Sequence, residues 1–147
     1  MQVIYPYAQL IHLICAVIFV GYLFFDVVIF KKALKKVDAD SGQKMKKAIT
    51  SVGVKIMPIC VLLLLLTGGM MMSTWVGSKV GGYFNSNLQI LFMIKVFLAF
   101  IIFIAVAINL SCKFIFKRQS PLGDIHPVAV VLAFIIIILA KAMFIFP

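Results

Sequence analysis

Four apolar stretches, each long enough to cross a bilayer, constrain this chain more than any other feature. They run from about residue 7 to 30, 52 to 75, 88 to 112 and 127 to 146 of the 147 residues. A spanning helix needs about 20 apolar residues, and in lipid its backbone must satisfy its hydrogen bonds within the segment. The sequence therefore predicts an all-α fold, in which residues 1–147 form one transmembrane domain, a bundle of four membrane-spanning helices.

The composition excludes two other classes of protein. Hydrophobic residues make up 65% of the chain and charged residues 12%, whereas an ordinary globular domain is about half apolar and about a quarter charged. A soluble globular domain and a disordered tail are both excluded. The first stretch lacks the basic start and the cleavage site of a signal peptide, so we expect it to be retained as a span.

The positions of the charges predict the topology. The net charge is +10, from 14 basic and 4 acidic residues, and the loops at 31–51 and 113–126 carry most of the basic ones, whereas the loop between them carries only Lys79. The basic loop residues are Lys31, Lys32, Lys35, Lys36, Lys44, Lys46, Lys47, Lys113, Lys117 and Arg118. By the positive-inside rule both loops are cytoplasmic and both termini lie outside.

The same charges indicate partners and location. Basic loops beside a membrane attract anionic lipid headgroups, and nothing else in the loops favours nucleic acid, so we expect none as a partner. We expect a multi-pass protein of the bacterial inner (cytoplasmic) membrane that forms a homo-oligomer.

Polar residues inside the spans form two layers when depth is taken from a rise of about 1.5 Å per residue. Ionisable groups in lipid are costly and usually face the interior of a bundle. The outer layer contains His12, Lys95 and Lys141, with Met70, Met71 and Met72 at similar depth. The inner layer contains Asp26, Lys55 and His126.

The inner layer predicts an ion pair. Asp26 and Lys55 have opposite charge, similar depth and neighbouring helices, so we expect them to pair; a structural lock on the hairpin and two side chains that snorkel to the interface are the alternatives. His126 precedes Pro127 and is expected to start the fourth helix.

The outer layer predicts a bound ligand. His12 begins a stripe at 3,4,3,4 spacing that marks the interior face of the first helix; the stripe consists of His12, Cys15, Phe19, Tyr22 and Asp26. Imidazole is a common metal and haem ligand, and Lys95 and Lys141 can neutralise carboxylates such as haem propionates. We therefore expect an anionic or metal-bearing guest, such as a haem or another anion, with His12 as the residue that would ligate a haem iron.

Two further interpretations stay open. Imidazole with soft sulfur suits Cu(I), so His12, Cys15 and the methionines Met70, Met71 and Met72 can form a copper site instead. In the third interpretation the protein is a structural or assembly subunit, and the polar layers serve packing alone. The cysteines form no CxxC pair, and we expect Cys60 and Cys112 to be small buried residues rather than parts of a disulfide framework.

Several segments resemble one family of membrane proteins. LIHLICAVIFVGYLFF at residues 10–25 resembles the first span of the copper resistance D (CopD) and HemJ-type proteins, and LTGG at 66–69 resembles the end of their second span. IKVFLAFIIFIAVAINL at 94–110 resembles their third span, and the HP and AKAMF of residues 125–144 are similar to the last HemJ span.

The resemblance to HemJ-type proteins implies haem b and the oxidation of protoporphyrinogen IX, with His12 at the place of the first-span histidine and Lys95 and Lys141 at the places of the membrane lysines. The chain departs from that pattern where YLFFDVVIF replaces a Leu-Pro-Arg motif and where the third span has no histidine. The resemblance to CopD-type proteins implies copper handling, and whether the protein is an enzyme stays open.

Overall fold

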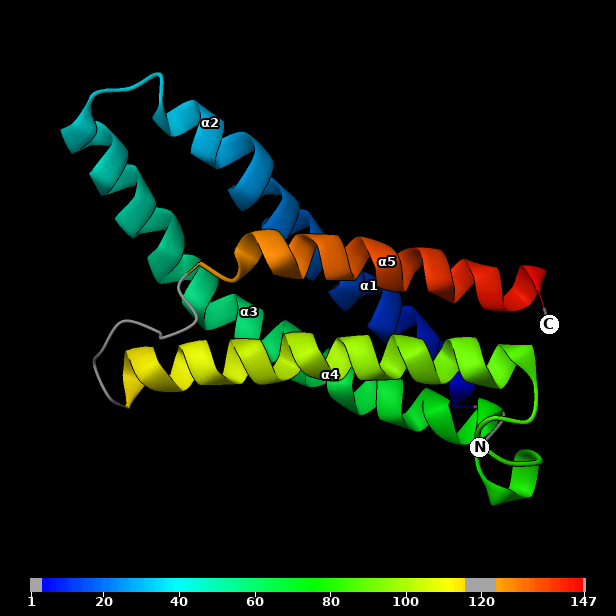
Figure 1. The fold of residues 1–147 in the computed structure, drawn as a ribbon. Helices are drawn as coiled ribbons and strands as arrows, with labels where there is room; N and C mark the ends of the chain where they lie inside the picture. Colours follow the sequence, from blue (N-terminus) through cyan, green and yellow to red (C-terminus); the bar gives the residue numbers. More distant parts are fainter. Residues whose placement is uncertain (1–3, 116–123, 147) are drawn as a thin grey trace. The chain divides into compact units, whose positions relative to one another are not determined.

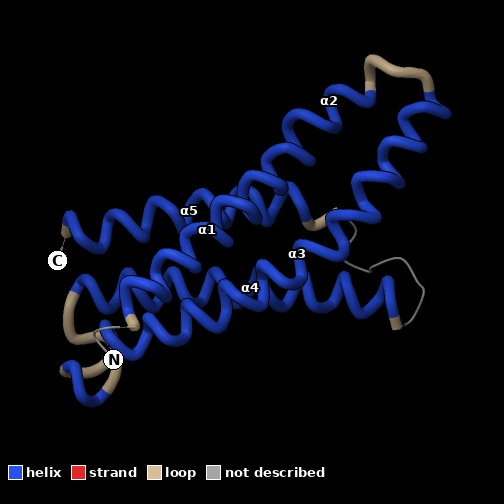
Figure 2. Tube along the Cα trace, turned by 180° about the vertical axis from the view of Figure 1, so that it is seen from behind, coloured by secondary structure: helices blue, strands red, loops and turns tan. Residues whose placement is uncertain are grey.

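The computed structural model describes residues 4–115 and 124–146, and these contain helices and loops but no strand (Figures 1 and 2). The four helices long and apolar enough to cross a membrane are Tyr5–Leu34, Ala39–Trp75, Asn87–Cys112 and His126–Ile145. They confirm the predicted all-α class and the four spans. The elements in order are α1 (Tyr5–Phe24), η1 (Phe25–Phe30), α2 (Lys31–Leu34), α3 (Ala39–Trp75), η2 (Ser78–Val80), α4 (Asn87–Phe114) and α5 (His126–Ile145).

The first span is one helix whose last part changes its winding. A proline in the first turn suits the start of α1, because proline lacks the N–H that a first turn cannot pair. The segment η1 is a π-helix and carries Asp26. A π-helix adds a residue to the turn, so the face predicted by the 3,4 spacing changes there. Phe19, Leu23 and Phe30 are buried, whereas Asp26 is half-buried.

The second helix begins at Ala39, thirteen residues before its predicted start at 52, so most of the predicted loop 31–51 is helical. At 37 residues it is about 55 Å long at 1.5 Å per residue, well beyond the bilayer core of about 30 Å. Hydropathy identifies only the apolar part of α3, residues 52–75, which lipid can cover. The lysine-containing turns before it, residues 39–51, are helical as well. The predicted loop 113–126 lies largely outside the described residues, as do Lys117 and Arg118.

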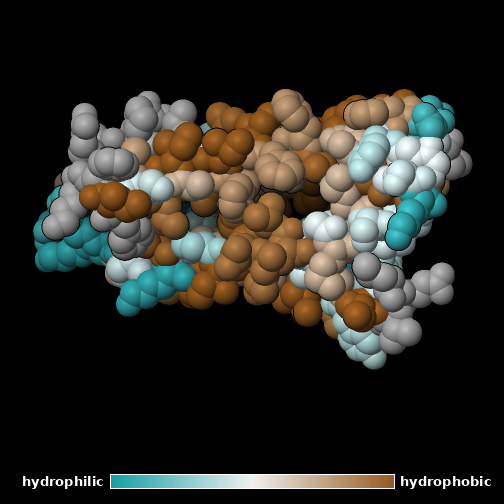
Figure 3. Space-filling view, turned by 90° about the horizontal axis from the view of Figure 1, so that it is seen from below, coloured by the Kyte–Doolittle hydropathy of each residue, from teal (hydrophilic) through white to brown (hydrophobic). Residues whose placement is uncertain are grey.

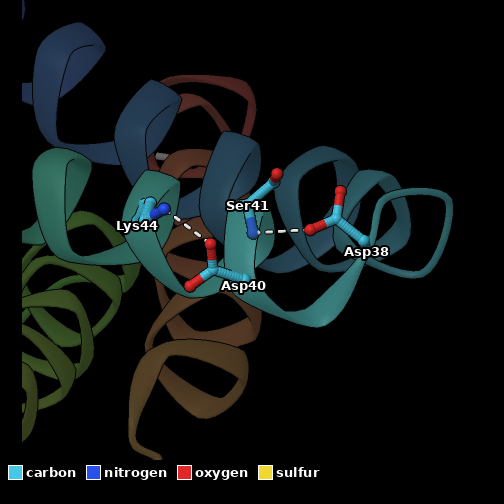
Figure 4. Close-up of polar contacts among 4 residues, drawn as sticks. All are labelled: Asp38, Asp40, Ser41 and Lys44. Atoms are coloured by element: carbon cyan, nitrogen blue, oxygen red, sulfur yellow. Dashed lines mark hydrogen bonds and ion pairs between the residues drawn. The ribbon is translucent and has the colours of Figure 1, made fainter.

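The early start of α3 is explained by its capping residues (Figure 4). The Ser41 backbone N–H donates to Asp38 Oδ2 at 2.9 Å, which satisfies one of the unpaired donors of a first turn. This hydrogen bond, helped by the Ser41 hydroxyl, lowers the pKa of the exposed Asp38 carboxyl. One turn further, Lys44 Nζ lies 2.5 Å from Asp40 Oδ2.

A glutamine organises the loop before α4. Ser86 caps the helix by accepting the backbone N–H of Gln89 at 3.2 Å. The buried Gln89 side chain then accepts from Asn85 N at 3.0 Å and donates to Val80 O at 3.1 Å. The sequence Ser-x-x-Gln matches a capping box, in which the glutamine accepts from the N-cap N–H. Here Gln89 accepts instead from the N–H of the residue before the cap, Asn85, and so holds the preceding loop.

The chain divides into two compact units, residues 1–72 and 73–147. In the first, α1 meets α3 at His12 with Thr67 and at Tyr22 with Gly53. In the second, α4 packs against α5, and Trp75 meets Phe144 edge-on with ring centroids 5.5 Å apart. The expectation that residues 1–147 form one domain stays a prediction.

The spans leave most of their apolar surface outside the chain's own core. Only 11% to 22% of the most apolar window of each span is buried, and Figure 3 shows hydrophobic residues across the middle of the face in view and hydrophilic residues toward its ends. Such surface is stable in lipid, so the protein is a multi-pass integral membrane protein.

Candidate functional site

The best-defined polar contact in the first unit joins His12 on α1 to Thr67 on α3. His12 Nδ1 lies 2.9 Å from Thr67 Oγ1, and Thr67 Oγ1 donates to the backbone carbonyl of Leu63 at 2.6 Å. His12 is half-buried and Thr67 is buried. A hydrogen-bond chain therefore connects the imidazole to the backbone of the facing helix.

This chain of hydrogen bonds assigns the tautomer of His12. A threonine hydroxyl has one proton, and here that proton is directed at the Leu63 carbonyl. Thr67 Oγ1 therefore accepts from His12, which places the imidazole proton on Nδ1. In the neutral ring the lone pair then lies on Nε2. An imidazole held in this way by its Nδ1–H is the usual arrangement of a metal-ligating histidine.

A glycine lets the imidazole approach α3. A Cβ added at Gly68 would lie 3.3 Å from His12 Cε1, tighter than ordinary van der Waals contact, whereas a Cβ at the neighbouring Gly69 would meet nothing within 4 Å. Of the two adjacent glycines, only Gly68 lies against the ring. The LTGG segment thus supplies both the hydroxyl that binds the imidazole and the space beside it.

The other predicted stripe residues lie further along the same two helices. The Tyr22 ring packs against Gly53, where an added Cβ would fall 2.5 Å from Tyr22 Oη. Between this contact and His12 lie Cys15 and Phe19, both buried. The stripe predicted from His12 to Tyr22 therefore faces α3.

The predicted copper donors are only partly assembled. Met71 lies four residues after Thr67 and thus on the same face of α3, whereas half of the Met70 surface is exposed. No group of three His, Cys, Asp or Glu side chains that could hold a metal is found among the described residues. A copper site at His12 would therefore depend on methionine.

The two lysines predicted to bind the ligand, Lys95 and Lys141, belong to the second unit and differ in exposure. Lys95 Nζ donates to Met143 Sδ at 3.8 Å and lies 4.4 Å above the centroid of the Phe92 ring. Lys141 is exposed, and its position two residues before Met143 puts it on another face of α5. That His12, Lys95 and Lys141 share one layer stays a prediction.

The inner layer is less defined. Asp26 is half-buried in η1 and Lys55 is exposed on α3; their ion pair stays a prediction. His126 is the first residue of α5, as expected, and its backbone N–H donates to Asp124 Oδ1 at 3.3 Å.

Two structural residues were not predicted. Thr67 follows an apolar run in which one hydroxyl carries little weight, and only the adjacent glycines mark the place where another group comes close. Gln89 had a usable signal, the Ser86-x-x-Gln89 spacing of a capping box.

These observations define the protein as a multi-pass integral membrane protein with a tautomer-fixed histidine between two of its helices. No protein-family model, curated protein or solved structure matches the chain. The resemblance to CopD and HemJ-type proteins stays a prediction.

Proposed function

We propose that the protein binds haem b in the membrane and acts in redox chemistry or haem handling, with His12 Nε2 as the iron ligand. The observation that carries the proposal is the hydrogen-bond chain from His12 Nδ1 through Thr67 Oγ1 to the Leu63 carbonyl. It holds the imidazole against α3 by its Nδ1–H, which is the usual arrangement of a metal-ligating histidine.

The residues present fit this cofactor. A haem iron is commonly held by one histidine, and a hydrogen bond from the other ring nitrogen raises the basicity of the ligand. Thr67 makes that bond here, and Gly68 leaves room for the ring. Bound haem would supply one-electron iron chemistry, and the resemblance adds a protoporphyrinogen-type oxidation as a reaction to test.

A half-buried cation, Lys95, supports an anionic guest. Among the described residues, the contacts of Lys95 are a thioether and an aromatic ring, and neither neutralises an ammonium charge as a carboxylate would. The chain has only four acidic residues. We propose that Lys95, together with Lys141, holds carboxylate groups, which haem carries as propionates.

A haem titration of the purified protein tests the proposal. We expect wild-type protein in detergent to give a Soret band of liganded haem at one haem per chain. His12→Ala should lose it, whereas His126→Ala, which changes the chain's other histidine at the start of α5, should keep it. An unchanged spectrum in His12→Ala would refute the proposal.

Copper is the second candidate, because Met71 shares the Thr67 face of α3 and Cys15 lies one turn from His12. A chain that retains copper after purification, and loses it on substitution of Met71 but not of the half-exposed Met70, would favour this site. A third candidate, an assembly subunit without a ligand, would be favoured by normal behaviour of a variant that lacks both His12 and Lys95.

We also propose that the protein resides in a bacterial inner membrane as a homo-oligomer, with its basic segments on the cytoplasmic side against anionic lipids. The lysines before and at the start of α3 support contact with lipid headgroups.

A further inference from the structure

Two cysteines of the first unit face one another across the helix pair. Cys15 lies in the stripe of α1 that meets α3 at His12 and Tyr22. Cys60 lies on α3 seven residues from each of the facing contacts, Gly53 and Thr67. Its side chain interacts with that of Cys15. Each residue is only 5% exposed, and both thiols are free. The sequence predicts Cys60 to be a small buried residue and Cys15 to be a candidate copper donor, with no pairing between them. The fold makes them a pair, although 45 positions separate them along the chain.

The pairing follows from the antiparallel course of α1 and α3. His12 meets Thr67 on one side of the thiols, and Tyr22 meets Gly53 on the other. Residue numbers rise along α1 as they fall along α3, and Cys15 with Cys60 lies between the two contacts. The helices are therefore held together both above and below the thiols, so the thiols share a fixed depth.

The depth of the two thiols in the membrane limits which oxidants can reach them. Cys15 lies ten residues after the start of α1 at Tyr5, about 15 Å along the helix, or about half of a bilayer core of about 30 Å. Water-soluble oxidants and thiol reductants do not enter this region. A lipid-soluble quinone does, and it accepts two electrons and two protons, the number that two thiols release.

We propose that Cys15 and Cys60 are a redox-active dithiol that reduces a membrane quinone. One S–S bond forms between the two sulfur atoms as both S–H bonds break. The two electrons and two protons pass to the quinone, whose carbonyl oxygens become the hydroxyls of the hydroquinone. The step requires no haem, and the resulting disulfide joins α1 to α3.

The test uses the full-length protein in lipid nanodiscs, with decylubiquinone as the oxidant and without air. After acid quenching and unfolding, a maleimide-polyethylene glycol reagent counts the remaining thiols. Wild-type protein should fall from three reactive thiols to one, with one hydroquinone formed per chain. Mass spectrometry should find the Cys15 peptide linked to the Cys60 peptide within a monomer.

The third cysteine supplies the matched control. Cys112→Ser should fall from two thiols to none at the wild-type rate, whereas Cys15→Ser and Cys60→Ser should keep two. Diamide, a membrane-permeant oxidant, tests whether the two thiols are close enough to form a disulfide, independently of their reaction with a quinone. A disulfide formed with diamide but not with the quinone would overturn the quinone step, and none with either oxidant would overturn the pair itself. Both readouts are made on the wild-type chain and do not depend on the folding of a variant.

Discussion

Replacement of Thr67 by valine tests the role of the hydrogen-bond chain behind His12. Valine has nearly the same shape as threonine and replaces the hydroxyl by a methyl group. His12 Nδ1–H then loses the acceptor it has at 2.9 Å, while the Leu63 carbonyl, which receives the hydroxyl proton at 2.6 Å, can keep its ordinary helix hydrogen bond. The change therefore isolates one donor, the imidazole N–H.

The expected size of the effect follows from that single donor. Hydrogen bonds between membrane helices contribute about 0.6 kcal/mol on average and at most about 1.7 kcal/mol. We place Thr67→Val near the upper value, because the hydroxyl is buried and the substitution leaves the imidazole donor without this partner. Loss of a hydrogen bond behind a metal ligand typically lowers metal affinity about 10- to 100-fold, and we expect that loss for haem.

Two assays measure these effects. Unfolding in mixed micelles by added sodium dodecyl sulfate gives the change in free energy, and titration with haem gives the change in affinity. Thr67→Ser keeps a hydroxyl and should resemble wild type in both assays. In a double-mutant cycle with His12→Ala, the Thr67→Val effect on stability should disappear. If Thr67→Val has wild-type stability and haem affinity, our account of the His12 tautomer is wrong.

Three further predictions concern packing, charge and pH. Gly53→Ala should lower the free energy of unfolding by about 1–3 kcal/mol, because its Cβ would lie 2.5 Å from a tyrosine oxygen on α1. Gly69→Ala, with open space at its Cβ, should raise the free energy of unfolding by up to about 1 kcal/mol. If denaturant unfolding gives equal effects for the two substitutions, the close packing at Gly53 is contradicted. Lys95→Met should stabilise the second unit by about 2 kcal/mol, since it removes a charge from the membrane core. Lys141 is exposed, so Lys141→Met should change thermal stability little. A loss of stability in Lys95→Met would show that the lysine is structural. The pKa of Asp38 is lowered in the folded state. Its carboxylate therefore stabilises the fold at pH values above the unfolded pKa of about 3.9. This contribution disappears as the pH falls through the lower folded pKa. Hydrogen exchange at the start of α3 should therefore quicken below about pH 4 in wild type but not in Asp38→Asn, and parallel pH profiles would contradict the assignment.

The four spans could be predicted from sequence because lipid imposes one simple requirement, a long apolar helix. The predicted spans 88–112 and 127–146 differ from α4 and α5 by at most two residues at either end. The start of α3 was missed by thirteen residues, because a basic amphipathic helix outside the lipid has no hydropathy signal. Its sequence signal was the capping residue Asp38 followed by Ser41.

The candidate site was only half predictable. His12 is conspicuous in the sequence because it is an ionisable residue inside an apolar span. An imidazole in such a place needs a hydrogen-bond partner. Its partner Thr67 and the facing positions of Cys15 and Cys60 depend on the register between two helices. Helical periodicity gives the face of each helix but not its sliding position against the next, so neither contact could be derived from one sequence.

The identity of the iron ligand is the most direct test of the proposed function. His12→Gly removes the imidazole, and free imidazole added to the haem-loaded variant can replace it. We predict that His12→Gly loses the wild-type Soret band and that imidazole restores it. Gly69→Ala, whose added Cβ would meet nothing within 4 Å, should keep the wild-type spectrum with and without imidazole. A wild-type spectrum in His12→Gly without imidazole would contradict coordination by His12.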